Sequence, residues 1–351
     1  MSTNRYTADR VSGGPAKSWA TILRAGAEHV KVSTWIALLL AVSPDVSPAD
    51  EPGGLRRIGY LAVDPAATYK PFGGAFRDGL RDAGYVEGKN ATILWRFAAN
   101  DLEALAALAS ELVNAKVEVL VADSTPAALA AKQATGTIPI VAIAGDLVRA
   151  GLASSLARPG GNVTGFSLMS PELMGKRLAI LKEMAPHISK VGVIVNPDNP
   201  SCTFQFNETQ AAAPRLGLTV HRVPIRKPEE IQQSLRSVVG RIDALLLTDD
   251  PLFDDNRTAI GTFAIQNRLP SICNYPVPDD KTCLIWYGPD FLQVVRRAAG
   301  VAARILSGAK PADLPVEQPR DINLIINART AQTLRLAIPQ SLRMAATKVV
   351  H

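Results

Sequence analysis

The sequence predicts an α/β protein with two Rossmann-like, doubly wound lobes, a hinge and a cleft between the lobes, on three observations. Short apolar runs alternate with stretches of helical apolar spacing, which is typical of parallel sheets covered by helices. The chain has 351 residues, whereas one hydrophobic core stops growing at roughly 250–300 residues. The alternation also occurs twice, before and after residues 137–167. We interpret that stretch as a crossing between the lobes.

In the first half, strands are expected where β-branched and apolar residues run together, and helices where apolar residues recur three or four apart. Gly84 and Pro126 punctuate these elements as a helix stop and a first-turn proline. The expected strands are residues 57–63, 91–97, 117–122 and 138–144, and the expected helices are 72–83, 102–115 and 126–135.

The crossing begins where Gly145 and Asp146 end an apolar strand. Apolar spacing then predicts a helix over residues 147–156, a Pro-Gly-Gly break follows, and an extended segment restarts at residue 163. In the second half, helices are expected at residues 171–184, 203–216, 228–239, 256–267 and 289–306, and strands at 191–195, 218–224, 244–248, 271–274 and 283–287. The tail is expected to hold two more extended pieces and a final helix at residues 328–336.

Composition argues against nucleic-acid partners. The net charge of +6 comes from 38 basic and 32 acidic residues that are scattered without a block of like charge. Aromatic residues make up only 5% of the chain and do not interleave with basic ones, so no base-stacking surface is indicated.

The amino-terminal segment predicts export. Residues 1–34 are polar and contain scattered basic residues, and residues 35–42 form an apolar run far shorter than the ~20 residues of a membrane span. Ser47 and Ala49 are small residues at the positions that precede a signal-peptide cleavage site. We therefore expect residues 1–49 to be a signal peptide and the mature protein to be periplasmic. The alternative is an amino-terminal extension of a cytosolic protein.

Candidate binding residues follow the expected strands, because helix N-termini there offer free N–H groups and ligands collect at the carboxyl edge of such sheets. These positions are residues 64–69, 123–126, 145–146, 196–199, 248–251 and 274–275. Ser124 or Thr125 could receive an anion, or could only cap its own helix. Asp249 could hold an ammonium group, whereas an aspartate directly before a proline, as in Asp250-Pro251, is typical of a turn. Tyr275 and Tyr287 could stack on a ligand or form the edge of the core.

Catalytic constellations are scarce. The sequence has no nucleophile elbow, no Walker loop and no dinucleotide fingerprint, and its four histidines lack metal-ligand spacing. We therefore expect a binding protein that is not an enzyme, with no cofactor and no metal. Cys273 and Cys283 could close a disulfide or could be separate buried thiols, with Cys202 left over.

Several long motifs then resemble a family. AGDLVRAGLASSLARPGGNVTGFS at residues 144–167 and PELMGKRLAILKEMAP at 171–186 resemble the substrate-binding proteins of bacterial ABC transporters of the tryptophan/tyrosine type. So do DDPLF, RLPSICNY, YGPDFLQVVRRAAG and INARTAQTLRLAIPQSL, and the resemblance covers about residues 56–342. It implies a fold like the type I periplasmic-binding proteins, with three crossings between lobes, and delivery of the ligand to an ABC permease in the inner membrane.

The family's cleft positions match Ser124, Thr125, Pro126, Gly145, Asp146, Asp249, Tyr275 and Tyr287, and we add Asn196 because it follows a strand. The chain departs from the family pattern at Leu147, where proline is usual, and in the segment PVPDDKTCLIW at residues 276–286. Both departures adjoin the expected pocket.

These observations predict an exported, monomeric solute-binding protein of an ABC importer. It would capture a small polar or amphipathic, amino-acid-like molecule by hinge closure. The alternatives are the ligand-sensing part of a signalling system and a cytosolic nucleotide-dependent α/β enzyme. We expect the N-terminal lobe to comprise residues 56–164 and 285–318, and the C-terminal lobe residues 165–284 and 319–345.

Overall fold

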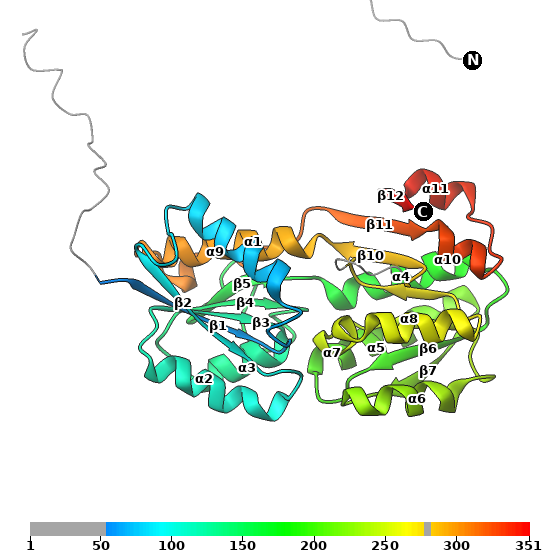
Figure 1. Cartoon of the computed structure of the whole chain (residues 1–351), viewed down its shortest axis with the longest axis horizontal. Helices are drawn as coiled ribbons and strands as arrows, with labels where there is room; N and C mark the ends of the chain where they lie inside the picture. The colour runs from blue at the N-terminus through cyan, green and yellow to red at the C-terminus, as the bar shows by residue number, and fades with distance from the viewer. Residues whose placement is uncertain (1–53, 277–281) are drawn as a thin grey trace, which may run out of the picture. The chain divides into compact units, whose positions relative to one another are not determined.

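The computed structural model describes residues 54–276 and 282–351. The expected signal peptide at residues 1–49 lies outside the described residues. Within them the chain builds two sheets, each covered by helices on both faces (Figure 1). No helix in this part of the chain is both long and apolar enough to span a membrane.

The N-terminal lobe contains an all-parallel sheet of order β2-β1-β3-β4-β5. Its strands are β1 (Arg56–Ala62), β2 (Ala91–Phe97), β3 (Val119–Asp123), β4 (Ile140–Ala144) and β5 (Val163–Ser167). Its helices are α1 (Lys70–Asp82), α2 (Leu105–Asn114), α3 (Thr125–Ala134) and α9 (Phe291–Leu306), with 3-10 turns η1 (Leu102–Ala104) and η4 (Pro311–Asp313). Because neighbouring strand residues point to opposite faces, Tyr60 packs into a core with α1 and α9, and Leu61 packs into a core with α2 and α3. Figure 1 shows these two pairs of helices on opposite faces of the sheet.

The C-terminal lobe contains a sheet of order β12-β11-β10-β9-β8-β6-β7, in which only the β10–β11 pair is antiparallel. Its strands are β6 (Lys190–Val195), β7 (Thr219–Pro224), β8 (Ala244–Leu247), β9 (Ser271–Cys273), β10 (Ile285–Pro289), β11 (Ile322–Asn327) and β12 (Lys348–Val350).

One face of this second sheet packs against α4 (Ser170–Met184), α5 (Pro200–Ala212), α10 (Ala328–Thr333) and α11 (Gln340–Ala345). The other face packs against α6 (Ile231–Val238), α7 (Pro251–Asp255) and α8 (Arg257–Gln266). The 3-10 turns η2 (Ala213–Leu216) and η3 (Pro228–Glu230) complete the lobe.

The described chain passes between the lobes after β5, between β10 and α9, and before β11. The last passage is tied to the first lobe by the Glu317 N–H, which donates to the carbonyl of Gly165 in β5. The crossings differ from the expected boundaries by a few residues. The expected division at 164/165 falls inside β5, and β10, expected in the first lobe, pairs with β9 and β11 in the second sheet.

The helix expected at residues 147–156 is wrong. The segment forms only a turn, because Gly151 adopts a left-handed backbone (φ 68°) and ends it. The Leu152 N–H donates to the carbonyl of Leu147 and the Gly151 N–H to that of Val148, the pattern of a helix C-terminus. The apolar spacing instead reflects burial, since Leu147, Leu152 and Ala153 all pack into the core of the first lobe.

The helix expected at residues 328–336 ends early for a similar reason. Arg335 is left-handed (φ 58°), and the Leu336 N–H donates back to the Ala331 carbonyl, which closes α10 after Thr333. The separate helix α11 and the strand β12 then complete the chain.

Candidate functional site

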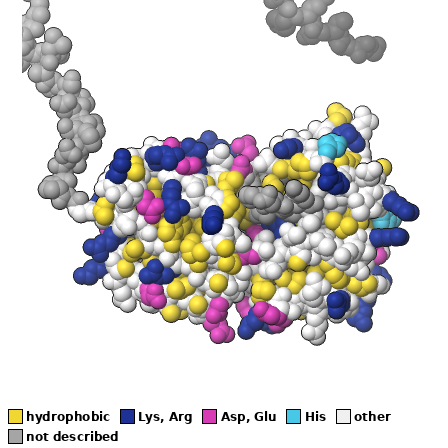
Figure 2. All heavy atoms as spheres, viewed as in Figure 1, with side chains coloured by type: hydrophobic (Ala, Val, Ile, Leu, Met, Phe, Trp, Pro, Cys, Tyr) yellow, Lys and Arg dark blue, Asp and Glu magenta, His cyan; other side chains and the backbone are white. Residues whose placement is uncertain are grey.

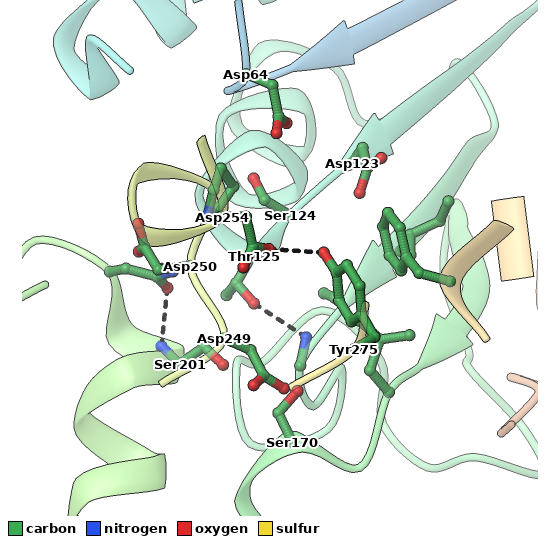
Figure 3. Close-up of a pocket in the computed structure, with 17 residues that line it drawn as sticks. Asp64, Asp123, Ser124, Thr125, Ser170, Ser201, Asp249, Asp250, Asp254 and Tyr275 are labelled. Carbon is green, nitrogen blue, oxygen red and sulfur yellow. Dashed lines mark hydrogen bonds between the residues drawn. The ribbon is translucent and has the colours of Figure 1, made fainter. Parts of the chain in front are cut away.

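A small cavity of about 40 Å³ lies where the two lobes meet, beyond the carboxyl ends of the strands (Figure 3). The first lobe contributes Asp64, Asp123, Ser124, Thr125, Ile143, Ala144, Gly145 and Phe291. The second contributes Leu168, Ser170, Asn199, Ser201, Asp249, Asp250, Pro251, Asp254 and Tyr275. The carboxyl edge of both sheets therefore forms one site, as expected for open α/β sheets.

Ser124 holds a strained backbone at the start of α3. Its φ of 98° and ψ of 158° fall in a region that non-glycine residues rarely adopt, at a cost of about 1–3 kcal/mol. This conformation places its Oγ where it accepts the Ala127 N–H at 3.3 Å and caps the helix. Because Oγ acts there as an acceptor, its own proton is available to a ligand.

Thr125 is 2% exposed and forms the first residue of α3. Its Oγ1 accepts the Gly145 N–H at 3.3 Å, so β3 and β4 are tied together at the cavity wall (Figure 3). Pro126 carries no N–H and follows it as the first-turn proline. The N-terminus of α3 thus offers hydroxyl donors and the positive end of a helix dipole, which suits a carboxylate.

Asp64 and Asp123 lie at one end of the cavity, with Ser170 and Asp249 at the opposite end (Figure 3). The hydroxyls of Tyr60 and Tyr69 donate to Asp123. Burial is the main cause that raises the pKa of Asp123 to about 7, and the tyrosine hydrogen bonds oppose it. Burial and the neighbouring charges of Asp123, Asp255 and Asp254 also raise the pKa of Asp64 well above its usual range.

Asp249 is held by an arginine from behind the cavity. Arg177 on α4 is fully buried and pairs with both oxygens of Asp249 at 2.5 and 3.3 Å. It also donates from Nε to the Tyr287 carbonyl at 2.8 Å. This bidentate geometry fixes the orientation of the Asp249 carboxylate while neutralising its charge.

A second buried arginine organises the opposite wall. Arg257 pairs with Asp254, and it donates to the Asn274 side chain at 2.7 Å and to the Tyr275 carbonyl. The Tyr275 hydroxyl donates to Asp254 at 2.7 Å (Figure 3), and its ring stacks on Phe291 at 4.7 Å and 6°. Phe291 starts α9 on the first lobe, so this stack links the two lobes directly.

Asp250 is buried and is held by hydrogen bonds within the second lobe. Its carboxylate accepts from Asn199 at 2.8 Å, from Asn196 at 3.4 Å and from the Leu252 N–H at 2.9 Å. Burial nevertheless raises its pKa. The buried thiol of Cys202 lies 3.5 Å from the same carboxylate and is a free cysteine.

The hydroxyl group of Ser170 lies at the cavity without a hydrogen-bond partner among the described residues. The residue itself is fully buried. Figure 3 shows the hydroxyl beside Asp249 at one end of the cavity. A buried hydroxyl is normally bonded, so this atom is free to bond a ligand.

Five of the sequence-predicted residues are brought together at this cavity: Ser124, Thr125, Gly145, Asp249 and Tyr275. Pro126 follows directly behind the lining in the first turn of α3. The other three lie outside the lining. Asp146 bonds the Val148 and Arg149 N–H groups, Asn196 supports Asp250, and Tyr287 packs against the second core. A direct contact of these three with ligand stays a prediction.

Besides the apolar residues Ile143 and Leu168, four lining residues were not singled out from the sequence: Ser170, Ser201, Asp254 and Phe291. Ser170 and Ser201 lie in the first turns of α4 and α5, so the rule that ligands meet helix N-termini could have identified them. Phe291 is the first residue of α9 and Asp254 lies in the first turn of α7, so the same rule also applies to them.

A disulfide joins Cys273 and Cys283 and closes the segment that carries Asn274 and Tyr275 into the site. Within residues 54–276 and 282–351, no three or more His, Cys, Asp or Glu side chains are grouped so as to hold a metal ion. The site is therefore built from hydroxyls, carboxylates and an aromatic stack.

Two doubly wound α/β lobes that enclose a polar cavity at their common carboxyl edge define a fold like the type I periplasmic-binding proteins, a class that binds small molecules. Residues 61–350 match the family model described as "ABC transporter substrate binding protein". The chain therefore belongs to the family of ABC transporter substrate-binding proteins.

Relatives agree with this assignment. A "Tyrosine-binding protein" of Clostridioides difficile (strain R20291) is 32% identical over 260 residues, which cover 74% of this chain and 75% of the relative. The ligand-free, open structure of CD0873 from Clostridium difficile, described as a substrate-binding protein with adhesive properties, is 28% identical. It superposes with a TM-score of 0.60 over 84% of this chain and 99% of its own.

A third similar structure is the ABC domain in complex with L-Trp from Streptococcus pneumonia. It superposes with a TM-score of 0.79 over 85% of this chain and 100% of its own, and at 24% identity it supports the fold alone. The family and its relatives point to a binding role rather than a catalytic one.

Proposed function

We propose that this chain is the exported solute-binding component of an ABC importer and that it captures an amino-acid-like ligand by closing its lobes. The observation that carries the proposal is the cavity itself, because both lobes line it and its polar groups are of two kinds. Hydroxyls of Ser124 and Thr125 at the start of α3 suit a carboxylate, and the Asp249 carboxylate, which Arg177 holds in place, offers its remaining lone pairs to an ammonium group.

Two contacts across the cleft support lobe closure. The Asn100 side chain, from the loop after β2, donates to Asp255 of α7 at 2.8 Å. Arg149, from the loop after β4, pairs with Glu208 of α5 at 2.7 Å. Neither contact belongs to the core of one lobe, so both would break as the lobes separate. A ligand that touches both lobes would shift the population toward this closed arrangement.

The relative described as open also supports closure. Its TM-score to this chain is only 0.60, although the two are 28% identical and 99% of the relative is covered. The L-Trp complex has a TM-score of 0.79 at a lower identity of 24%. We infer that a wider angle between the lobes of the open structure accounts for this difference.

Thermal denaturation against a panel of amino acids and other small metabolites tests the proposal. A ligand at 100 times its Kd adds about 2.7 kcal/mol to the free energy of unfolding, which raises Tm measurably. We expect at least one amino-acid-like compound to do so. A panel without any shift would contradict the binding role.

Export is tested separately by the mass of the protein recovered from the periplasm of an expressing bacterium. We expect a mature chain that begins near Asp50. An uncut chain found only in the cytosol would contradict export while leaving ligand binding untouched.

A further inference from the structure

In the described part of the chain, the side chains that line the cavity carry acidic groups without basic ones. The lining includes five aspartates and no lysine, arginine or histidine among the described residues. Buried Arg177 neutralises Asp249 and buried Arg257 neutralises Asp254, both from behind the wall. The other three carboxylates, Asp64, Asp123 and Asp250, have no ion-pair partner in the part of the chain that the structure describes.

Asp250 differs from the other two because it is bonded by Asn199, Asn196 and a backbone N–H, as a buried structural carboxylate should be. Asp64 and Asp123 instead lie together at one end of the cavity (Figure 3). Around Asp123 the polar neighbours are the hydroxyls of Tyr60 and Tyr69. Tyrosine hydroxyls orient a carboxylate but leave its charge in place.

The surroundings offer Asp64 and Asp123 further negative charge instead of compensation. Asp254 and Asp255 raise the pKa of Asp64, and Asp254 raises that of Asp123. Burial raises the pKa of both most strongly. Because Asp123 is buried and Asp64 lines the same end of the cavity, this pair is stabilised by gaining a proton or a cation.

The opposite end of the cavity gives independent evidence of a ligand. The Ser170 Oγ is fully buried and has no hydrogen-bond partner within residues 54–276 and 282–351, and it faces the cavity beside Asp249 (Figure 3). Ser170 and the Arg177-paired Asp249 form an end without net charge, which suits the polar head of a ligand. The cavity thus has one end without net charge and one doubly acidic end.

Resting on the proposed function, we propose that the ligand carries a net positive charge, with a cationic group held between Asp64 and Asp123. The substrate class is amino acids with a basic side chain, or a small diamine, rather than neutral amino acids such as tyrosine. A neutral amino acid whose α-ammonium binds at Asp249, as in the proposed function, would leave the acidic end of the cavity uncompensated.

Isothermal titration calorimetry with matched ligand pairs tests this inference. L-Ornithine and L-norleucine differ by an ammonium in place of a methyl group, and L-arginine and L-citrulline differ by a guanidinium in place of a neutral urea. L-Tyrosine and putrescine complete the panel. We expect a cation to bind about ten- to a hundredfold more tightly than its neutral partner, the range expected for a charge-assisted hydrogen bond.

Substitutions at the two aspartates test whether they cause the preference for a cationic ligand. Asp64→Asn and Asp123→Asn should each reduce the preference for the cation about tenfold or more, whereas Asp313→Asn, an exposed carboxylate in η4, should leave it unchanged. Asp64 is only half-buried, so its variant is expected to fold even where the Asp123 variant is less stable.

The outcomes separate the two proposals. Binding of L-tyrosine, L-norleucine or L-citrulline at least as tightly as the cations overturns this inference and leaves the proposed function standing. A cation preference that persists in both variants also overturns it. No binding by any member of the panel overturns both this inference and the amino-acid-like ligand of the proposed function.

Discussion

Gly145 and Ser201 approach each other so closely across the cleft that a methyl group on Gly145 would overlap the Ser201 hydroxyl. Gly145 follows β4 of the first lobe, and Ser201 lies in the first turn of α5 of the second lobe. Gly145 does not have a left-handed backbone, so alanine could adopt its conformation without strain. The closeness of the two lobes, and not backbone geometry, therefore favours glycine here, because a larger residue would force the Ser201 hydroxyl to move.

Gly145→Ala is therefore expected to keep each lobe folded but to hinder closure. The Kd of a ligand that bridges the lobes should rise about tenfold or more, or about 1.4 kcal/mol. Calorimetric titration measures the change. The double variant Gly145→Ala/Ser201→Ala removes the overlapping hydroxyl and should recover most of the affinity; a double variant as weak as the single one would show that the steric explanation is wrong.

Removal of Arg177 should destabilise the protein, because it leaves the Asp249 carboxylate, only 11% exposed, without its cation. Breaking a buried pair from one side costs about 3–5 kcal/mol. We expect Arg177→Met to lower the free energy of unfolding in urea by this amount. Arg177→Met/Asp249→Asn should regain part of the loss. Equal stability of wild type and Arg177→Met would contradict a buried ion pair.

The stability of the ligand-free protein should fall as pH rises from about 4 to about 7. The pKa of Asp123 is raised from 3.8 to about 7 by burial, so within this window the folded state holds a proton that the unfolded chain has lost. Above about pH 7 both states are ionised and this contribution is constant.

Urea unfolding across the pH range measures the slope. Asp123→Asn should make it shallower without abolishing it, because the pKa values of Asp64, Asp250 and Asp254 are raised in the same direction. Asp313→Asn serves as the control and should keep the wild-type slope. An unchanged slope in Asp123→Asn would rule out this carboxylate as its source.

The disulfide between Cys273 and Cys283 should stabilise the fold under oxidising conditions. The two cysteines are ten positions apart, and closing a loop of this length is worth about 2–3 kcal/mol through the unfolded state. We expect the paired Cys273→Ala/Cys283→Ala variant to unfold at correspondingly lower urea concentration, and a reductant to have the same effect on wild type only. Identical midpoints with and without reductant would contradict this expectation.

The sequence predicted the lobes and part of the site because both depend on local pattern. Residues directly after strands gave Ser124, Thr125, Gly145, Asp249 and Tyr275, all of which line the cavity. Strand ends share one edge of a parallel sheet whatever the details of packing, so position in the sequence was enough.

The rest depended on contacts between distant segments. Tyr287 was expected to end a strand, but it lies in the middle of β10, and its carbonyl accepts from Arg177, which is 110 residues away. The two arginines that neutralise the cavity wall lie inside α4 and α8, where the sequence offers no reason to distinguish them from surface arginines. The apolar pattern of residues 147–156 predicted their burial correctly. It also predicted a helix, which does not form because the left-handed backbone of Gly151 ends the turn.

Small-angle X-ray scattering of the protein with and without a saturating ligand from the panel tests the central claim most directly. The account predicts a smaller radius of gyration when ligand is bound, as the lobes adopt the closed arrangement in which Gly145 meets Ser201 and Asn100 meets Asp255. It also predicts that Gly145→Ala stays expanded at the same ligand concentration. A wild-type radius that does not change at saturation would contradict binding by lobe closure.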